Sequence, residues 1–167
     1  MAAEELKLYV LIGLPGSGKS HWVKIMNPKR AGCIVINRDA MRYMVNGGTC
    51  QYTKEKEKTI KEGCAGMLRD AMLRGMADVI IDETNTTQKQ RAHWIEIVKE
   101  SAGRLFCKKV RVIAVVMKET DAYKCVMQRM RDSRGQSATV WWNVIAKMSA
   151  EYEAPEMGEG FDEIIEA

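Results

Sequence analysis

The sequence predicts a three-layer α/β/α domain with a central parallel sheet of four to five strands. Short, uninterrupted runs of Val, Ile and Leu are typical of strands that are covered on both faces. Segments with apolar residues at helical spacing separate these runs, so strands and helices alternate along the chain. Right-handed crossovers then bring the carboxyl ends of the strands, where such folds bind ligands, to one edge of the sheet.

Each predicted element rests on one of these two patterns. Strands are expected over the apolar runs Leu6–Ile12, Ile34–Ile36, Asp78–Asp82 and Val110–Met117, with a fifth, edge strand at Glu163–Glu166. Helices are expected over Lys19–Met26, Ala40–Val45, Thr53–Arg74, Gln88–Ser101, Glu119–Arg131 and Val140–Glu153. The longest of these helices begins with a Lys/Glu-rich stretch that we expect to face solvent.

The composition fits one folded domain spanning residues 1–167. Hydrophobic residues make up 46% of the chain and charged residues 29%, which excludes a disordered protein. The net charge of +4 is compatible with a polyanionic partner but does not require one. The five Cys form no CxxC pair, the acidic start is unlike a secretory leader, and the apolar runs are too short to span a bilayer. We therefore expect a cytoplasmic protein with no membrane partner, and its oligomeric state stays open.

A glycine-rich loop follows the first predicted strand. Residues 13–20 read Gly-Leu-Pro-Gly-Ser-Gly-Lys-Ser and match GxxxxGK[ST] between a strand and a helix, which is the context that this motif requires. Its backbone N–H groups and the helix N-terminus cradle phosphate oxygens, while the Lys and the Ser serve the β/γ phosphates and Mg²⁺. We expect ATP and Mg²⁺ as cofactors, with Ser20 on the metal. The expected ATP-binding residues of the loop are Gly13, Pro15, Gly16, Ser17, Gly18, Lys19 and Ser20.

Acidic side chains follow the second and third strands. Asp39, beyond Ile36, is placed to accept a proton from an attacking hydroxyl, with Arg42 on the same helical face for an acceptor phosphate. The alternative makes Asp39 the N-cap of the next helix. Asp82 suits an acid that acts on the metal through water, and Glu83 competes with it for that role. Thr84 and Asn85 are expected to cap the following helix or to touch the site.

A polar segment late in the chain carries several arginines. Residues 129–134 read Arg-Met-Arg-Asp-Ser-Arg, and a lid over about 129–139 would bring Arg131 and Arg134 onto the triphosphate. Arg129 and Arg131 flank Met130, and which of the two joins Arg134 there stays open. The alternative is a solvated loop. His21 and His93 have no partners at ligand spacing and are expected to be structural or surface residues.

Several segments together resemble the polynucleotide 5′-hydroxyl kinases, a family of P-loop phosphotransferases, over about residues 6–155. The kinase domain of the T-even bacteriophage end-healing enzyme is the member that the chain resembles most. The resemblance is carried by GLPGSGKSHW, INRDAMRYMV, QYTKEKEKTI, IIDETNTTQKQRAHW and the arginine segment. The family has Ser-Asp-Thr-Asn where this chain has Asp82-Glu83-Thr84-Asn85, so the identity of the functional acid stays open.

The resemblance implies ATP-dependent transfer of the γ-phosphate to the 5′-hydroxyl of DNA or RNA. It implies catalytic roles for Lys19, Asp39 (general base), Arg42 and Arg134. It implies acceptor contacts from Arg38, Asp39, Arg42, Glu83 and Thr84. No DxDGT phosphatase motif is present, so we expect a kinase without a phosphatase domain. Two alternatives remain: a P-loop kinase of a small-molecule or tRNA-linked hydroxyl, and a nucleotide-binding module without activity.

Overall fold

A five-stranded parallel sheet forms the centre of the computed structural model, which describes residues 5–29, 32–48, 53–75, 77–101, 109–131 and 137–167. The strand order is β2-β3-β1-β4-β5, and every neighbouring pair is parallel. The strands are β1 (Glu5–Ile12), β2 (Ile34–Ile36), β3 (Val79–Ile81), β4 (Lys109–Val116) and β5 (Glu163–Glu166). The predicted parallel sheet is therefore confirmed, including the edge strand at the tail.

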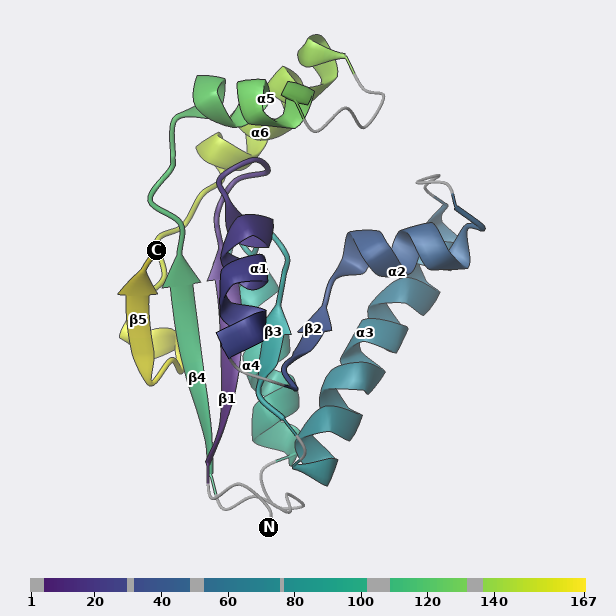
Figure 1. Cartoon of the computed structure of the whole chain (residues 1–167), viewed down its shortest axis with the longest axis vertical. Coiled ribbons are helices and arrows are strands. Elements are labelled where there is room, and N and C mark those ends of the chain that lie inside the picture. Colours follow the sequence, from purple (N-terminus) through teal and green to yellow (C-terminus); the bar gives the residue numbers. More distant parts are fainter. Residues whose placement is uncertain (1–4, 30–31, 49–52, 76, 102–108, 132–136) are drawn as a thin grey trace.

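Helices cover both faces of the sheet (Figure 1). They are α1 (Lys19–Lys29), α2 (Arg38–Val45), α3 (Lys54–Arg74), α4 (Gln88–Ser101), α5 (Ala122–Arg131) and α6 (Ala138–Ala150), with a 3₁₀ turn η2 (Met157–Glu159). Alternate residues of β1 face opposite ways, so Leu8 and Val10 pack against α3 and α4 while Tyr9 and Leu11 pack against Val23 of α1. The predicted three-layer arrangement is confirmed.

Helices α5 and α6 form a separate pair beyond the carboxyl ends of the strands (Figure 1). Their shared core consists of Cys125, Val126 and Ile145, and Leu14 from the glycine loop packs into the same cluster. The pair is therefore joined directly to the loop that follows β1.

Most of the helices have bounds that differ from the sequence prediction, and side-chain caps explain several of the starts. Helix α2 begins two residues earlier, at Arg38, after the cap Asn37, and α3 begins at Lys54 because Thr53 is its cap. Helix α5 begins at Ala122, since Asp121 accepts a hydrogen bond from the Lys124 N–H at 3.1 Å. Helix α6 begins at Ala138, since the Ser137 hydroxyl accepts from the Val140 N–H, and it ends at Ala150. Helix α1 runs three residues beyond its predicted end, to Lys29.

Asn85 has a structural position, and the expectation that it caps α4 or touches the site is wrong. It is 1% exposed, has φ +46°, and donates from its side chain to the Leu11 carbonyl at 2.8 Å. Its side-chain oxygen accepts from the Trp94 indole at 3.1 Å, and Arg91 donates to its carbonyl. The cap of α4 is Thr87, whose hydroxyl accepts from the Gln90 N–H at 3.4 Å. Asn85 thus joins β1 to α4 directly below the glycine loop.

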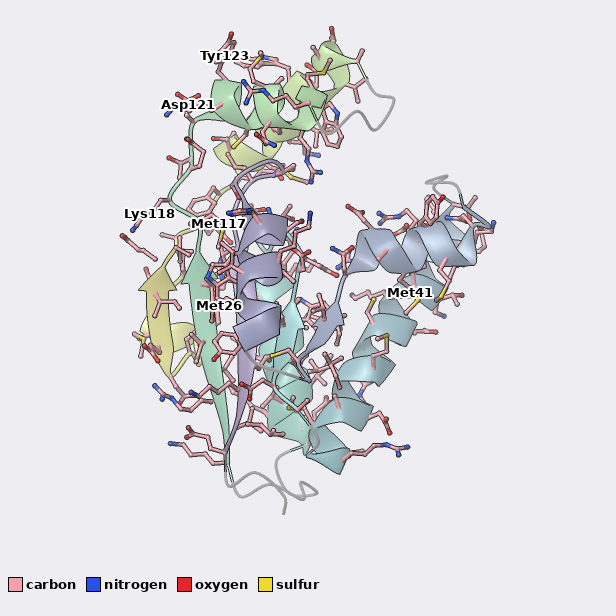
Figure 2. All side chains as sticks on the ribbon, viewed as in Figure 1. Met26, Met41, Met117, Lys118, Asp121 and Tyr123 are labelled. Atoms are coloured by element: carbon pink, nitrogen blue, oxygen red, sulfur yellow. The ribbon has the colours of Figure 1, made fainter. Side chains whose placement is uncertain are left out.

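The remaining features bear on what the domain can do. No helix in the described part of the chain is long and apolar enough to cross a membrane. Met41 of α2, labelled in Figure 2, packs onto α3, where a Cβ on Gly63 would lie 3.5 Å from its Cε atom. This contact seats α2, and the polar residues that it carries, against the long helix.

Candidate active site

The glycine loop between β1 and α1 has a backbone that only glycine permits at two close approaches. A Cβ on Gly13 would lie 2.6 Å from Ser17 Oγ and 2.9 Å from the Cβ of Met117, which Figure 2 labels at the end of β4. Gly16 has φ +87°, and a Cβ there would lie 2.4 Å from the Cys125 carbonyl oxygen. The loop therefore fits tightly between β4 and α5.

Lys19 is held inside this loop. Its side chain is 6% exposed, and Nζ donates to the carbonyl oxygens of Gly13 and Leu14 at 2.7 Å each. Burial lowers the pKa of Lys19 to about 8; the Asp82 carboxylate opposes this change and the Arg129 guanidinium adds to it. Ser17 is also buried, and its hydroxyl has no hydrogen-bond partner among the described residues. A buried cation and a buried hydroxyl without a partner suit an oxygen-rich anion such as a triphosphate.

A pocket of about 520 Å³ opens in front of the loop. Four segments line it: the loop and start of α1, the end of β2, the end of β3, and α5. Its lining residues are Gly16, Ser17, Gly18, Lys19, Ser20, His21, Lys24, Asn37, Asp39, Asp82, Glu83, Thr84, Gln128 and Arg129. Gly13 and Pro15, also predicted to bind ATP, are buried and do not line the pocket.

Asp82 lies beside Ser20 at the wall of this pocket. The Ser20 hydroxyl is 3.5 Å from Asp82 Oδ2, which places the two predicted metal-associated groups together. No cluster of three or more His, Cys, Asp and Glu in the described ranges could hold a metal ion by itself. Mg²⁺ would therefore need the oxygens of a bound nucleotide besides Ser20, which is how P-loop proteins bind it.

Asn37 is a candidate site residue that the sequence reasoning missed. Its side-chain amide donates to Asp82 Oδ2 at 2.9 Å and to the Asp82 carbonyl at 3.2 Å. Its side-chain oxygen accepts from the Ala40 N–H at 2.8 Å and so caps α2. The alternative that Asp39 is the N-cap is therefore wrong, and Asp39 lies in the first turn of the helix. An Asn at the end of a strand, two residues before the candidate base, was the available signal.

Asp39 and Arg42 lie on the same face of α2, as their spacing predicted. The Arg42 guanidinium donates to the Asp39 carboxylate and, through two nitrogens, to Glu57 on α3. The hydrogen bond from Arg42 lowers the pKa of Glu57 and, in return, raises that of Arg42. The Asp39 side chain is 54% exposed and lines the pocket, so an acceptor can reach it. The expectation that the Lys/Glu-rich start of α3 faces solvent is thus wrong for Glu57.

Arg38 and Glu83 form the second ion pair on this side. Two nitrogens of the Arg38 guanidinium donate to the two carboxylate oxygens of Glu83, at 3.1 and 2.6 Å. Burial raises the pKa of Glu83, and Arg38 opposes the change. Both acids after β3 face the pocket, Asp82 toward Ser20 and Glu83 toward Arg38, because both follow the last strand residue, Ile81. Thr84 lines the same wall.

The two arginines at the end of α5 lie differently with respect to the pocket. Arg129 lines the pocket, whereas Arg131 is exposed and is not a lining residue. Arg134 lies outside the described residues, as does most of the predicted lid, so the roles of Arg131 and Arg134 stay predictions. His21 lines the pocket at the start of α1, and His93 lies beside Trp94 on α4, with 5.0 Å between the ring centroids.

The fold and the loop define the class: a P-loop kinase-like domain. The sequence matches the family described as AAA domain over residues 8–155, and the chain belongs to this family. A chain of the Pnkp1/Rnl/Hen1 RNA repair complex shares the fold with a TM-score of 0.70 at 20% identity, over 87% of this chain and 43% of that one. This chain spans less than half the length of the repair-complex chains that it matches.

Two further solved structures share the fold over nearly the whole chain. A fungal RNA kinase has a TM-score of 0.68 at 15% identity, covering 99% of this chain and 76% of its own. Mycobacterium tuberculosis APS kinase CysC, solved with AMPPNP and APS, has a TM-score of 0.56 at 14% identity, covering 98% and 90%. At these identities the likeness shows the fold alone. Kinases named for different acceptors, RNA and APS, share this fold.

Proposed function

We propose that this protein transfers the γ-phosphate of ATP to the 5′-hydroxyl end of DNA or RNA. The observation that carries the proposal is one pocket lined both by the phosphate loop and by Asp39. Phosphoryl transfer needs the donor phosphates and the proton acceptor to face a common space, because the reacting groups must lie in line. The arrangement of these residues supports that geometry.

The donor would bind on the loop side. Lys19 and the loop N–H groups suit the β and γ phosphates, and Ser20, with Asp82 next to it, would hold Mg²⁺. The metal would supply neutralisation of charge on the triphosphate. Binding a phosphate oxygen would turn the Lys19 ammonium away from the Gly13 and Leu14 carbonyls, which hold it now.

The acceptor would bind on the α2 side. Asp39 takes the proton of the 5′-hydroxyl, whose oxygen forms a bond to the γ-phosphorus. The bond from that phosphorus to the β–γ bridging oxygen breaks, and ADP leaves. Arg42, adjacent to Asp39, suits the first phosphate of the acceptor strand. The RNA repair complex and the fungal RNA kinase among the structural neighbours favour a nucleic-acid acceptor.

A second candidate keeps the chemistry and changes the acceptor to a small-molecule or tRNA-linked hydroxyl. The observation in its favour is that Arg38 and Arg42 are each bound to carboxylates, so the acceptor side presents little net positive charge. The fold similarity to APS kinase points the same way.

One assay separates these candidates. The purified protein is given γ-labelled ATP and Mg²⁺ with 5′-hydroxyl DNA and RNA oligonucleotides, their 5′-phosphorylated forms, and a panel of small alcohols. Label on the 5′-hydroxyl oligonucleotides alone supports the proposal. Label on small alcohols alone contradicts it and supports the second candidate, and ATP binding without transfer to any acceptor indicates a module without activity.

The salt dependence of the acceptor KM gives an independent test. A polyanionic acceptor releases counterions when it binds, so its KM should rise steeply with salt concentration while the KM of a small neutral alcohol stays flat. An oligonucleotide KM that is insensitive to salt would count against a nucleic-acid substrate.

A further inference from the structure

The sequence leaves open whether Arg129 or Arg131 reaches the triphosphate, and the structure distinguishes the two arginines. Arg129, in the last turn of α5, lines the phosphate pocket together with the loop residues. Arg131 lies two positions further on, about 200° around the helix axis, and is exposed. Of the two arginines in this turn, α5 therefore presents Arg129 to the pocket.

The Arg129 side chain lies against an aromatic ring. Its guanidinium carbon is 5.1 Å from the ring centroid of Trp141 on α6. This distance is within the range, up to about 6 Å, in which a cation is attracted to a ring face. A planar guanidinium stacks well on an indole, so the ring restricts a side chain that otherwise has many rotamers. The neighbouring Trp142 is 47% exposed and takes no part in this contact.

Trp141 is itself fixed relative to the phosphate loop. It packs against the cluster formed by Leu14, Cys125 and Ile145, and Leu14 belongs to the loop. The Cys125 carbonyl of α5 lies against Gly16 of the same loop. Loop, α5 and Trp141 are therefore one packed unit, and the ring sets where Arg129 stands with respect to the loop.

The charge at the pocket is consistent with an anion site between Arg129 and Lys19. The Arg129 guanidinium adds to the lowering of the Lys19 pKa, after the larger effect of burial and against the Asp82 carboxylate. Two cations that repel each other across a pocket are both stabilised when a polyanion binds between them.

We propose that Arg129 binds the donor phosphate groups and that Trp141 is a positioning residue that holds it toward them. This inference rests on the donor half of the proposed function, namely that the pocket binds a nucleoside triphosphate, and it is independent of the acceptor. The ring would supply order before binding, since a guanidinium already held toward the phosphates loses less conformational freedom when they arrive.

The test measures nucleotide binding without any acceptor. The Kd values of Mg·ATP and of AMP are determined by calorimetry for the wild type and for Arg129→Gln, Trp141→Leu, Trp141→Phe and Trp142→Leu. Arg129→Gln should raise the Kd of ATP about tenfold or more, the usual effect of losing a charged hydrogen bond. The Kd of AMP should change much less, because AMP lacks the β and γ phosphates.

The two Trp141 variants separate positioning from packing. Trp141→Leu should raise the Kd of ATP about two- to fivefold, the range of a cation–π contact. Trp141→Phe keeps a ring, so its Kd for ATP should stay close to that of the wild type. Trp142→Leu removes an indole from the same helix and should leave the Kd unchanged. In the Arg129→Gln background Trp141→Leu should have no further effect, because the two residues act as one unit.

Several results would overturn the inference. One is that Trp141→Leu raises the Kd of ATP in the Arg129→Gln background as much as it does in the wild type. A second is that Arg129→Gln raises the Kd values of ATP and AMP equally. A third is that Arg131→Gln raises the Kd of ATP more than Arg129→Gln does. A wild type that binds no ATP would also overturn it. A protein that binds ATP as expected but labels no oligonucleotide would contradict the proposed acceptor and leave this inference supported, so the two failures can be told apart. Thermal unfolding of each variant identifies any that fails to fold, in which case Trp141→Phe and the Arg129 variant carry the test.

Discussion

The proposed donor side of the pocket, formed by the phosphate loop and α5, differs from the proposed acceptor side, formed by α2 and the start of α3, in how charge is held. On the donor side Lys19 is buried, its ammonium is held by backbone carbonyls, and burial lowers its pKa to about 8. On the acceptor side Arg38 and Arg42 are paired with Glu83, Asp39 and Glu57. On the donor side the Lys19 ammonium is therefore held by uncharged carbonyl oxygens, whereas on the acceptor side both arginines are bound to carboxylates.

This difference has a physical consequence for the two substrates. A triphosphate brings charge that the donor side needs, so most of its binding energy should come from electrostatic contacts. The reacting group of the acceptor is a neutral hydroxyl, so the acceptor side needs a carboxylate that takes its proton, besides Arg42 for the neighbouring phosphate. The arginines there orient carboxylates, and Asn37 joins the two sides through Asp82.

The largest effect that tests this comparison is expected at Asp39. Asp39→Asn keeps the shape and removes the proton acceptor, so the transfer rate should fall by a factor on the order of 10²–10⁴. The Kd of ATP should stay within about twofold, because the donor side is untouched. Single-turnover transfer and nucleotide binding measure the two quantities. Asp70→Asn, at an exposed pair on α3, is the matched control. Full activity in Asp39→Asn would remove Asp39 as the base.

A smaller loss is expected at Asn37, where the two sides meet. Asn37→Ser keeps an oxygen that can cap α2 but loses the amide donor to Asp82, and transfer should fall about tenfold. Asn37→Asp also keeps the cap but brings a second carboxylate to Asp82, so a larger loss and a higher Mg²⁺ requirement are expected.

Unfolding temperature separates capping from orientation in these variants. Both replacements are good N-cap residues, so stability should change little. Wild-type transfer and an unchanged Mg²⁺ requirement in both variants would show that Asn37 acts only as a cap.

The pH dependence of binding should differ between the two sides. In the free protein Lys19 loses its proton as the pH rises through about 8, and a bound phosphate, which favours the charged amine, raises that pKa. The affinity for ATP should therefore be level up to about pH 8 and fall above it by at most about tenfold per pH unit. Lys19→Arg, which stays charged, should give a flat profile.

The acceptor side should not follow this profile. Its cations are arginines, and hydrogen bonding to Glu57 raises the pKa of Arg42 further, so the acceptor KM should be flat between pH 7.5 and about 9.5. Measuring both constants across this range tests the comparison directly. A KM for the acceptor that rises in parallel with the Kd of ATP would contradict it.

Much of the fold could be predicted because local patterns determine it. Uninterrupted apolar runs predicted strands that are buried on both faces, as in a parallel sheet. A glycine motif between a strand and a helix predicted the loop at residues 13–20. The helix starts were less predictable, since they depend on single caps such as Asn37, Asp121 and Ser137. A residue that suits a cap can also stand one or two positions away from it, as Asp39 does.

The motif residues of the candidate site could be predicted, but the residues that hold them in place could not, because those contacts join segments far apart in the sequence. Lys19, Ser20, Asp39 and Asp82 belong to motifs, and the pocket brings them together. The groups that hold them make contacts between elements remote in sequence: Asn37 with Asp82, Glu57 with Arg42, and Trp141 with Arg129. A single sequence shows no such pairings. For this reason Glu57 was expected to face solvent with the other charged residues at the start of the long helix.

Glu57 provides the smallest of the expected effects and the sharpest test of how the acceptor side works. Glu57→Gln keeps the side-chain length but replaces a charged, two-fold contact with Arg42 by a single neutral one. Arg42 would then be less well oriented toward both Asp39 and the acceptor. We expect the acceptor KM to rise about three- to tenfold, the effect of weakening one charged hydrogen bond, with the Kd of ATP unchanged.

The control for this variant is Glu55→Gln, in the same first turn of α3, at an exposed position outside the ion-pair network. It changes net charge equally, so it removes any general electrostatic effect on a polyanionic acceptor. If Glu57→Gln instead lowered the acceptor KM, Glu57 would be competing with the substrate phosphate for Arg42. The acceptor side would then be an anion-binding site that the Glu57 carboxylate fills in the free protein. Both sides would bind anions, and they would differ only in whether a carboxylate of the protein already fills the site.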